Sequence, residues 1–161
     1  MAEVRLIDRN PRADAVALLA RFVPPRRFAD VSFESFVPNP EHRSQLDALT
    51  ELRGFGEALA MPRPAASRSR FRRVGRAPEA NTRPARYLDG GFGVGKTHLL
   101  ASLWHQSPAP KAFLTFAELT AVIGFLGMEQ AVHAFRSFRL VCIDEFELDD
   151  VANTLMAVTF L

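Results

Sequence analysis

A glycine-rich loop followed by lysine and threonine points to chemistry more directly than any other part of this sequence. Residues 90 to 97 read Gly-Gly-Phe-Gly-Val-Gly-Lys-Thr, which matches G-x-x-x-x-G-K-[ST] at every fixed position. In such a loop, backbone N–H groups surround a phosphate, the lysine reaches the outer phosphates and the threonine hydroxyl binds Mg²⁺. The residues predicted to surround a nucleotide are Gly90, Gly91, Phe92, Gly93, Val94, Gly95, Lys96, Thr97 and His98.

An acidic pair at the end of an apolar run supplies the second half of a nucleotide-hydrolysing site. Residues 140 to 145 read Leu-Val-Cys-Ile-Asp-Glu, and Asp144 follows Lys96 by 48 residues, which leaves room for one strand and its helices. We expect Asp144 and Thr97 to hold Mg²⁺, and Glu145 and Lys96 to be the catalytic residues, with Glu145 polarising the attacking water. The leading interpretation is therefore binding and hydrolysis of ATP with Mg²⁺. The alternative for the acidic pair is a solvated strand end.

Composition places the chain among ordinary globular proteins. Its 161 residues are 48% apolar, enough for one domain with a core, and no apolar run approaches the length of a membrane span. The start, Met-Ala-Glu-Val-Arg, is not an export signal, and the single cysteine, Cys142, fits a reducing compartment. We therefore expect a cytoplasmic protein without a transmembrane segment, in which Cys142 is a buried core residue.

Positive charge is concentrated in one segment. Eight of the arginines fall between Arg63 and Arg86, where Glu79 is the only acid, although the net charge of the chain is only +2. The segment has no hydrophobic period and contains several prolines, which favours a flexible linker over residues 61–86. A nucleic-acid site is possible but not favoured, because Phe71 is the only aromatic residue available for base stacking.

The residues before this segment predict a helical N-terminal extension, residues 1–60. Asn10-Pro11 should start a helix that runs to Val23, and Pro24-Pro25 should stop it. The run from Phe28 to Phe36 has the aromatic and β-branched residues of an extended piece. Asn39-Pro40 should open a second helix with an apolar stripe.

Residues 87–161 alternate strand and helix, as a parallel α/β sheet requires. Short strands are expected at 87–89, 111–115 and 138–143. A helix is expected at 97–105. Thr115 to Glu118 forms a capping box for the next helix, which Gly127 should end. A short helix is expected to follow at 128–135. A last helix should begin near Asp150. The predicted fold is an α/β P-loop NTPase, with the ATPase domain at 87–161.

Two stretches resemble the ZapE family of cell-division-associated AAA+ ATPases, which includes mitochondrial AFG-like ATPases. They are Tyr-Leu-Asp-Gly-Gly-Phe-Gly-Val-Gly-Lys-Thr at 87 to 97 and Cys-Ile-Asp-Glu-Phe-Glu-Leu-Asp-Asp-Val-Ala at 142 to 152. The second is more diagnostic, because the acidic pair is followed by Phe and then by Asp-x-Ala. The resemblance implies an FtsZ-like division protein as a possible partner. It also implies homo-oligomerisation, with a neighbour's arginine completing the site.

Two departures from that family keep other functions open. His98-Leu99-Leu100-Ala101 is closer to DnaA- and DnaC-like initiators and helicase loaders, so an ATP-dependent nucleic-acid loader is the rival enzyme. The family's ATPase domain also continues through a sensor strand, an arginine finger and a helical lid. We therefore expect a C-terminally truncated domain, and a non-catalytic fragment that binds nucleotide is the rival from another class.

Overall fold

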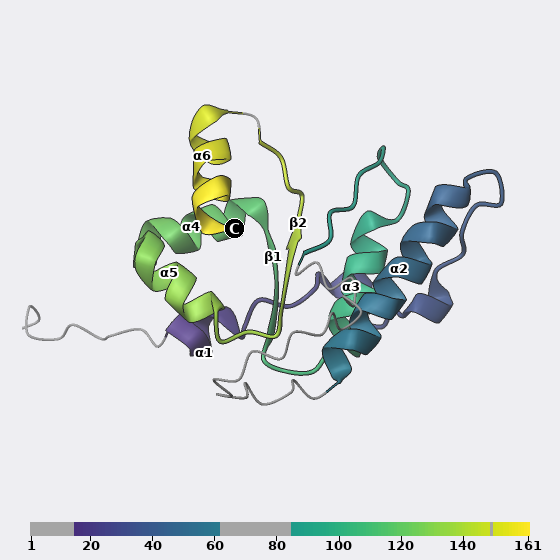
Figure 1. The fold of residues 1–161 in the computed structure, drawn as a ribbon, viewed down its shortest axis with the longest axis horizontal. Coiled ribbons are helices and arrows are strands. Elements are labelled where there is room, and N and C mark those ends of the chain that lie inside the picture. Colours follow the sequence, from purple (N-terminus) through teal and green to yellow (C-terminus); the bar gives the residue numbers. More distant parts are fainter. Residues whose placement is uncertain (1–14, 62–84, 149) are drawn as a thin grey trace, which may run out of the picture. The chain divides into compact units, whose positions relative to one another are not determined.

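The computed structural model describes residues 15–61, 85–148 and 150–161 of the 161-residue chain (Figure 1). The helix start predicted at Asn10-Pro11 and most of the predicted linker lie outside these residues. The described residues belong to two compact units. The sheet unit contains the described residues up to Arg26 together with Ala109–Leu161, and the loop unit contains those of Arg27–Pro108.

Two parallel strands organise the sheet unit. Strand β1 (Lys111–Thr115) pairs with β2 (Leu140–Asp144), and the register places Thr115 opposite Asp144 at the carboxyl end. Helices α4 (Phe116–Leu126) and α5 (Met128–Phe135) form the crossover between the strands, as a parallel pair requires. The carboxyl ends of both strands therefore meet at one edge, where open α/β sheets bind ligands.

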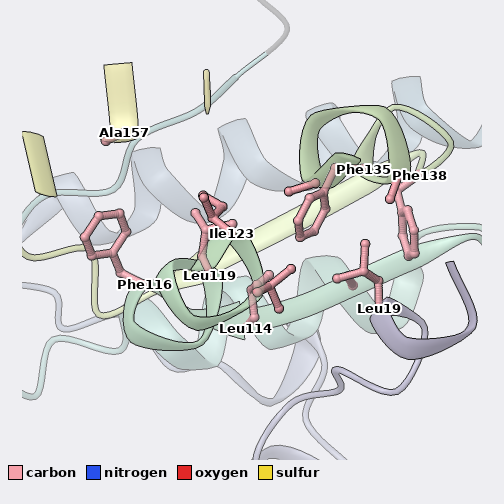
Figure 2. Packing of buried hydrophobic residues seen from close by; sticks show 12 residues of the cluster. Leu19, Leu114, Phe116, Leu119, Ile123, Phe135, Phe138 and Ala157 are labelled. Atoms are coloured by element: carbon pink, nitrogen blue, oxygen red, sulfur yellow. The ribbon is translucent and has the colours of Figure 1, made fainter. Parts of the chain in front are cut away.

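Apolar side chains from the strands and their covering helices form the core of the sheet unit (Figure 2). Leu114 of β1 and Leu119 of α4 are almost completely buried, and Phe135 and Phe138 pack against each other with ring centroids 6.1 Å apart. Helix α1 (Ala15–Leu19) adds Leu19, which has no exposed surface. An N-terminal helix is thus part of the same core as the predicted ATPase strands.

Helix caps set the boundaries of the remaining helices in this unit. The Thr115 hydroxyl accepts the N–H of Glu118 and the Glu118 carboxylate accepts the N–H of Thr115, which confirms the predicted capping box of α4. Helix α6 (Val151–Phe160) begins after Asp150, whose Oδ1 accepts the N–H of Asn153 at 2.7 Å. The strand at 111–115, the helices after it and the start of the last helix all lie close to where the sequence predicts them.

Two long helices form the loop unit. Helix α2 (Arg43–Ala60) packs against α3 (Lys96–Gln106), and two short 3₁₀ turns, η2 (Arg26–Phe28) and η3 (Phe33–Ser35), precede α2 in the chain. Gly56 allows the close approach of the helices, since a Cβ there would lie 3.1 Å from side-chain atoms of both Leu103 and Gln106. Helix α3 confirms the helix predicted after the glycine loop.

The extended piece predicted from Phe28 to Phe36 is wrong. The segment contains η3, closed by a capping box in which Ser32 and Ser35 bond to each other's backbone. The Ser35 hydroxyl accepts the N–H of Ser32 at 3.0 Å and the Ser32 hydroxyl accepts the N–H of Glu34 at 3.2 Å. Serine side chains that bond to nearby backbone offer the chain an alternative to the strand.

The strand predicted at Tyr87–Asp89 is also wrong, since residues 85–91 have no regular structure. A strand requires a hydrogen-bonded neighbour, and in the part of the chain that the structure describes the sheet contains only β1 and β2. The Asp89 side chain instead accepts the N–H of Gly90 at 2.7 Å.

Two helix boundaries differ from the sequence prediction. Helix α1 ends at Leu19 rather than near Val23, and the Phe22 carbonyl accepts the N–H of Phe113 on β1 at 2.9 Å. Helix α2 begins at Arg43 rather than at Asn39-Pro40, because the Asn39 side chain closes a local turn by accepting the N–H of Glu41 at 3.0 Å. In both places a specific hydrogen bond competes with the helix.

Candidate functional site

The glycine loop leads directly into α3. Gly95 is the residue before the helix and has left-handed backbone angles, with φ 92° and ψ 19°. Its carbonyl accepts the first helical hydrogen bond, from the N–H of Leu99 at 3.0 Å. Lys96 and Thr97 therefore lie in the first helical turn, where the unpaired backbone N–H groups and the helix dipole favour an anion.

The Lys96 side chain lies back across the loop. Its ammonium donates to the carbonyl of Gly90 at 2.7 Å and to that of Gly91 at 2.8 Å. An ammonium has three N–H donors and no acceptor, so two of its three hydrogen bonds are made to the loop. The side chain thus joins the first and last parts of the glycine loop.

A cavity of about 250 Å³ borders the loop within the same unit. One wall is the glycine loop with Lys96, and the other is the first part of α2. The residues that line it are His42, Ser44, Gln45, Ala48, Leu88, Asp89, Gly90, Gly91, Val94, Lys96 and Leu99. The contribution of α2 to this cavity was not predicted, because the sequence gives no pairing signal between the start of α2 and the glycine loop.

An arginine holds the chain that enters the loop against α2. Arg86 Nε lies 2.8 Å from the Glu51 carboxylate, and the guanidinium lies over the Phe55 ring at 5.0 Å from its centroid. The side chain of Arg86 is 19% exposed and that of Glu51 is 64% exposed, so the guanidinium is held mainly by packing on Phe55 and the ion pair adds little. Sequence reasoning assigned Arg86 to the linker and missed this role.

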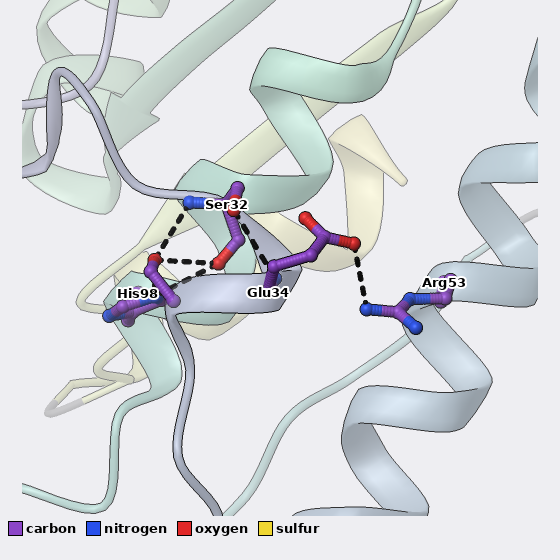
Figure 3. Close-up of polar contacts among 5 residues, drawn as sticks. Ser32, Glu34, Arg53 and His98 are labelled. Carbon is purple, nitrogen blue, oxygen red and sulfur yellow. Dashed lines mark hydrogen bonds and ion pairs between the residues drawn. The ribbon is translucent and has the colours of Figure 1, made fainter.

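His98 and Phe92 were both predicted beside the nucleotide, and the structure gives them different surroundings. Nε2 of His98 lies 3.0 Å from the hydroxyl of Ser35 and 3.2 Å from the carbonyl of Ser32 (Figure 3). Phe92 is fully exposed at the tip of the glycine loop. His98 is therefore in contact with the turn that precedes α2.

The acidic pair lies at the carboxyl end of β2, in the sheet unit. Asp144 is 9% exposed and Glu145 is exposed with φ 51°, a left-handed conformation that residues other than glycine rarely adopt. Phe146 packs edge-on against Phe116 of α4 at 4.9 Å between ring centroids. Strand pairing and this aromatic contact together position the acidic pair. The glycine loop and the acidic pair belong to different units, so their assembly into one site stays a prediction.

The oxygen donors predicted for the metal suit Mg²⁺. Thr97 supplies a hydroxyl in the first turn of α3 and Asp144 a carboxylate at the end of β2. Mg²⁺ prefers oxygen ligands and commonly takes one or two from the protein, with water and substrate phosphates supplying the rest. Within the described ranges, no three His, Cys, Asp or Glu side chains form a metal-binding group.

Burial controls the ionisation of the groups beside the acidic strand. Burial, then the nearby charge of Asp144, raises the pKa of Cys142 to about 12. Burial also lowers the pKa of Lys111. Cys142 is thus an uncharged core thiol, as the sequence predicts, and is not a nucleophile.

No helix in the described part of the chain has both the length and the apolar character that crossing a bilayer would need.

Comparison with protein-family models gives a match to the family described as AFG1-like ATPase, over residues 14–161. No curated protein and no solved structure matches the chain. The family match includes both the glycine loop and the acidic strand, and it agrees with the resemblance found in the sequence. The mixed helical and parallel-strand architecture fits an α/β fold of the P-loop type. Because the match extends over nearly the whole sequence, the chain belongs to the AFG1-like ATPase family.

Proposed function

We propose that this chain is an AAA+ type P-loop ATPase that binds ATP with Mg²⁺ and hydrolyses it. The observation that carries the proposal is the position of Lys96, in the first turn of α3 and hydrogen-bonded to the carbonyls of Gly90 and Gly91. A phosphate held at this helix end would meet the backbone N–H groups, the helix dipole and the ammonium together. Membership of an ATPase family supports the same assignment.

Each site residue has a separate role in the proposed reaction. Residues 90–97 surround the nucleotide, and Lys96 exchanges loop carbonyls for oxygens of the outer phosphates. The oxygen of a water forms a bond to the γ-phosphorus while the bond to the β–γ bridging oxygen breaks, giving ADP and inorganic phosphate. Glu145 orients this water and accepts its proton. Mg²⁺, held through Thr97 and Asp144, would offset the negative charge on the phosphates.

The test measures nucleotide binding and phosphate release separately. We expect the wild-type chain to bind ATP with Mg²⁺ and to release phosphate. Lys96→Ala should lose binding, because it removes the ammonium that meets the phosphates. Glu145→Gln should bind normally but release phosphate at least about 100-fold more slowly. Equal affinity of wild type and Lys96→Ala for nucleotide would contradict the proposal.

We further propose a role in cell division through an FtsZ-like partner, with self-association that completes the site. The support is the resemblance of the acidic strand and the residues after it to the ZapE family. Co-sedimentation with FtsZ polymers and light scattering with and without ATP would test these two points. Stimulation of phosphate release by single-stranded DNA, with strongly salt-dependent binding, would favour the loader function instead.

A further inference from the structure

The segment 28–36, which includes η3, is joined to α3 by two histidines. His98 Nε2 contacts the Ser32 carbonyl at 3.2 Å, and His105 Nε2 contacts the Phe28 carbonyl at 2.9 Å. A carbonyl oxygen only accepts, so each Nε2 carries the hydrogen and donates it. The histidines are seven residues apart, which puts them on one face of the helix. Two residues of α3 thus bind two backbone carbonyls of the segment.

The segment presents His98 with an acceptor site whose shape is already fixed. The Ser35 hydroxyl donates to the Ser32 carbonyl at 2.8 Å, while Ser35 Oγ accepts from the Ser32 N–H at 3.0 Å. The hydrogen of Ser35 is therefore used within the turn, and Nε2 of His98 donates to both Ser35 Oγ and the Ser32 carbonyl (Figure 3). The contact depends on a turn that forms from its own residues.

The same segment is also held against α2. Arg53 forms an ion pair with Glu34 at 3.0 Å (Figure 3). Its guanidinium lies 5.8 Å from the centroid of the buried Phe33 ring. The segment therefore connects the two long helices of the loop unit, and its position is fixed from both sides.

Phe36 extends these contacts to the glycine loop itself. Its ring lies 5.5 Å from the His98 ring in an edge-on arrangement, and it packs on Gly95, where an added Cβ would approach its Cε2 to 2.5 Å. Gly95 is the residue immediately before Lys96 and has a positive φ. The segment thus reaches the point where the glycine loop turns into α3.

From these contacts we infer that Phe36 and His98 are positioning residues for the glycine loop. They hold Gly95 and the first turn of α3 in the conformation that binds phosphate. The segment 28–36 therefore sets the affinity for nucleotide. His98 acts through Ser35 and Ser32, without touching the nucleotide. This inference rests on the proposed nucleotide binding. By linkage, nucleotide must stabilise the segment as much as the segment stabilises bound nucleotide.

The experiment measures the dissociation constant of a fluorescent ADP derivative with Mg²⁺ for the full chain and its variants. Phe36→Ala and His98→Ala should weaken binding by about three- to tenfold, the size expected when one net hydrogen bond or packing contact is lost. His98→Gln should restore affinity to near wild type, because its amide N–H reaches about as far as Nε2. Val37→Ala, at an 85% exposed neighbour of Phe36, is the matched control and should not change affinity.

A double-mutant cycle separates action through the segment from direct contact with nucleotide. Ser35→Ala removes a partner of His98 from outside α3, and it should weaken binding like His98→Ala, with no further loss in the double variant. Additive losses would show that His98 acts independently of the turn and would overturn the inference. Because Ser35 is exposed, Ser35→Ala should still fold, and it tests the inference even if Phe36→Ala does not fold.

Hydrogen exchange distinguishes a positioning role in nucleotide binding from a role in stability alone. ADP should slow exchange of the Ser35 amide, which donates to the Ser32 carbonyl at 3.1 Å, in wild type but not in Lys96→Ala. Unchanged affinity in Phe36→Ala and His98→Ala, with binding abolished in Lys96→Ala, would overturn the inference and leave the proposed function intact. Failure of wild type itself to bind nucleotide would instead remove the proposed function.

Discussion

The ring of Phe36 occupies the space that a side chain at Gly95 would need, since a Cβ there would lie 2.5 Å from Cε2 of Phe36. Gly95 also has φ 92°, which side chains rarely allow. The fixed glycine of the phosphate-loop pattern is thus required for two separate reasons. One is the backbone turn into α3, and the other is packing against a residue far away in the sequence.

Gly95→Ala should therefore destabilise the chain by roughly 2–4 kcal/mol, combining backbone strain with overpacking against Phe36. Gly91→Ala is the matched control within the loop, because its φ is not positive and no atom lies within 4 Å of its Cβ position. Chemical denaturation of each variant measures the difference. The double variant Phe36→Ala/Gly95→Ala should regain only the stability lost to overpacking, because the backbone strain at position 95 remains. A Gly95→Ala chain as stable as Gly91→Ala would show that neither strain nor overlap operates.

Local signals predicted the sheet unit well. Thr115 and Glu118 have the spacing of a capping box, Gly127 ends the helix, and an apolar run precedes Asp144. Each of these signals involves residues a few positions apart, and short-range chemistry was enough to place strands β1 and β2 and helices α4 and α5.

The loop unit was predicted less well, because its structure depends on pairs distant in sequence. The serines at 32 and 35 turn an aromatic run into η3, and an S-x-x-S signal was available to show this. The contacts of Phe36 with Gly95, of His98 with Ser32 and of Arg86 with Glu51 had no local signal at all. The site residues could be proposed from two motifs, whereas the segment that holds them could not.

The capping box of α4 gives a direct test of the fold. Thr115→Val keeps the size of the side chain but removes the oxygen that accepts the Glu118 N–H at 3.2 Å, and should cost about 1 kcal/mol of unfolding free energy. Thr115→Ser keeps the hydroxyl and should stay within about 0.5 kcal/mol of wild type. Thermal unfolding compares the two variants. A valine variant as stable as the serine variant would show that the cap contributes nothing.

The raised pKa of Cys142 predicts both its reactivity and a dependence of stability on pH. Burial moves this pKa from 9.0 to about 12. At pH 8 the thiolate fraction in the folded chain should be roughly 1000-fold below that of the unfolded chain, and iodoacetamide labelling should slow at least in proportion. Rapid labelling of the native chain at pH 8 would contradict burial of the thiol.

The sign of the pH effect follows from the direction of the shift. The folded chain keeps the Cys142 proton at a pH where the unfolded chain has lost it, so this contribution to stability is complete below pH 9 and is lost as the pH rises toward 12. Cys142→Ala should reduce the fall in stability across that window, measured by denaturant titration at several pH values. An identical fall in both chains would assign the effect to other groups.

Glu145 combines an unfavourable conformation with the proposed catalytic role. Its φ of 51° places an ordinary residue in the left-handed region, at a cost of about 1–2 kcal/mol. Asparagine tolerates this region better, so Glu145→Asn should raise the unfolding free energy by about 0.5–1 kcal/mol while phosphate release is lost. The matched control is Glu147→Asn, two residues further on where φ is not positive, and it should leave stability unchanged.

Opposite changes in stability and turnover at Glu145 would mean that the carboxylate is retained for chemistry at the expense of folding. If Glu145→Asn is instead less stable than wild type, the glutamate side chain makes a favourable contact and its left-handed conformation does not cost stability. If stability rises and phosphate release is unchanged, Glu145 is not the residue that activates water. Asp144, buried at the adjoining position and opposite Thr115, would then be the next carboxylate to test by the same pair of measurements.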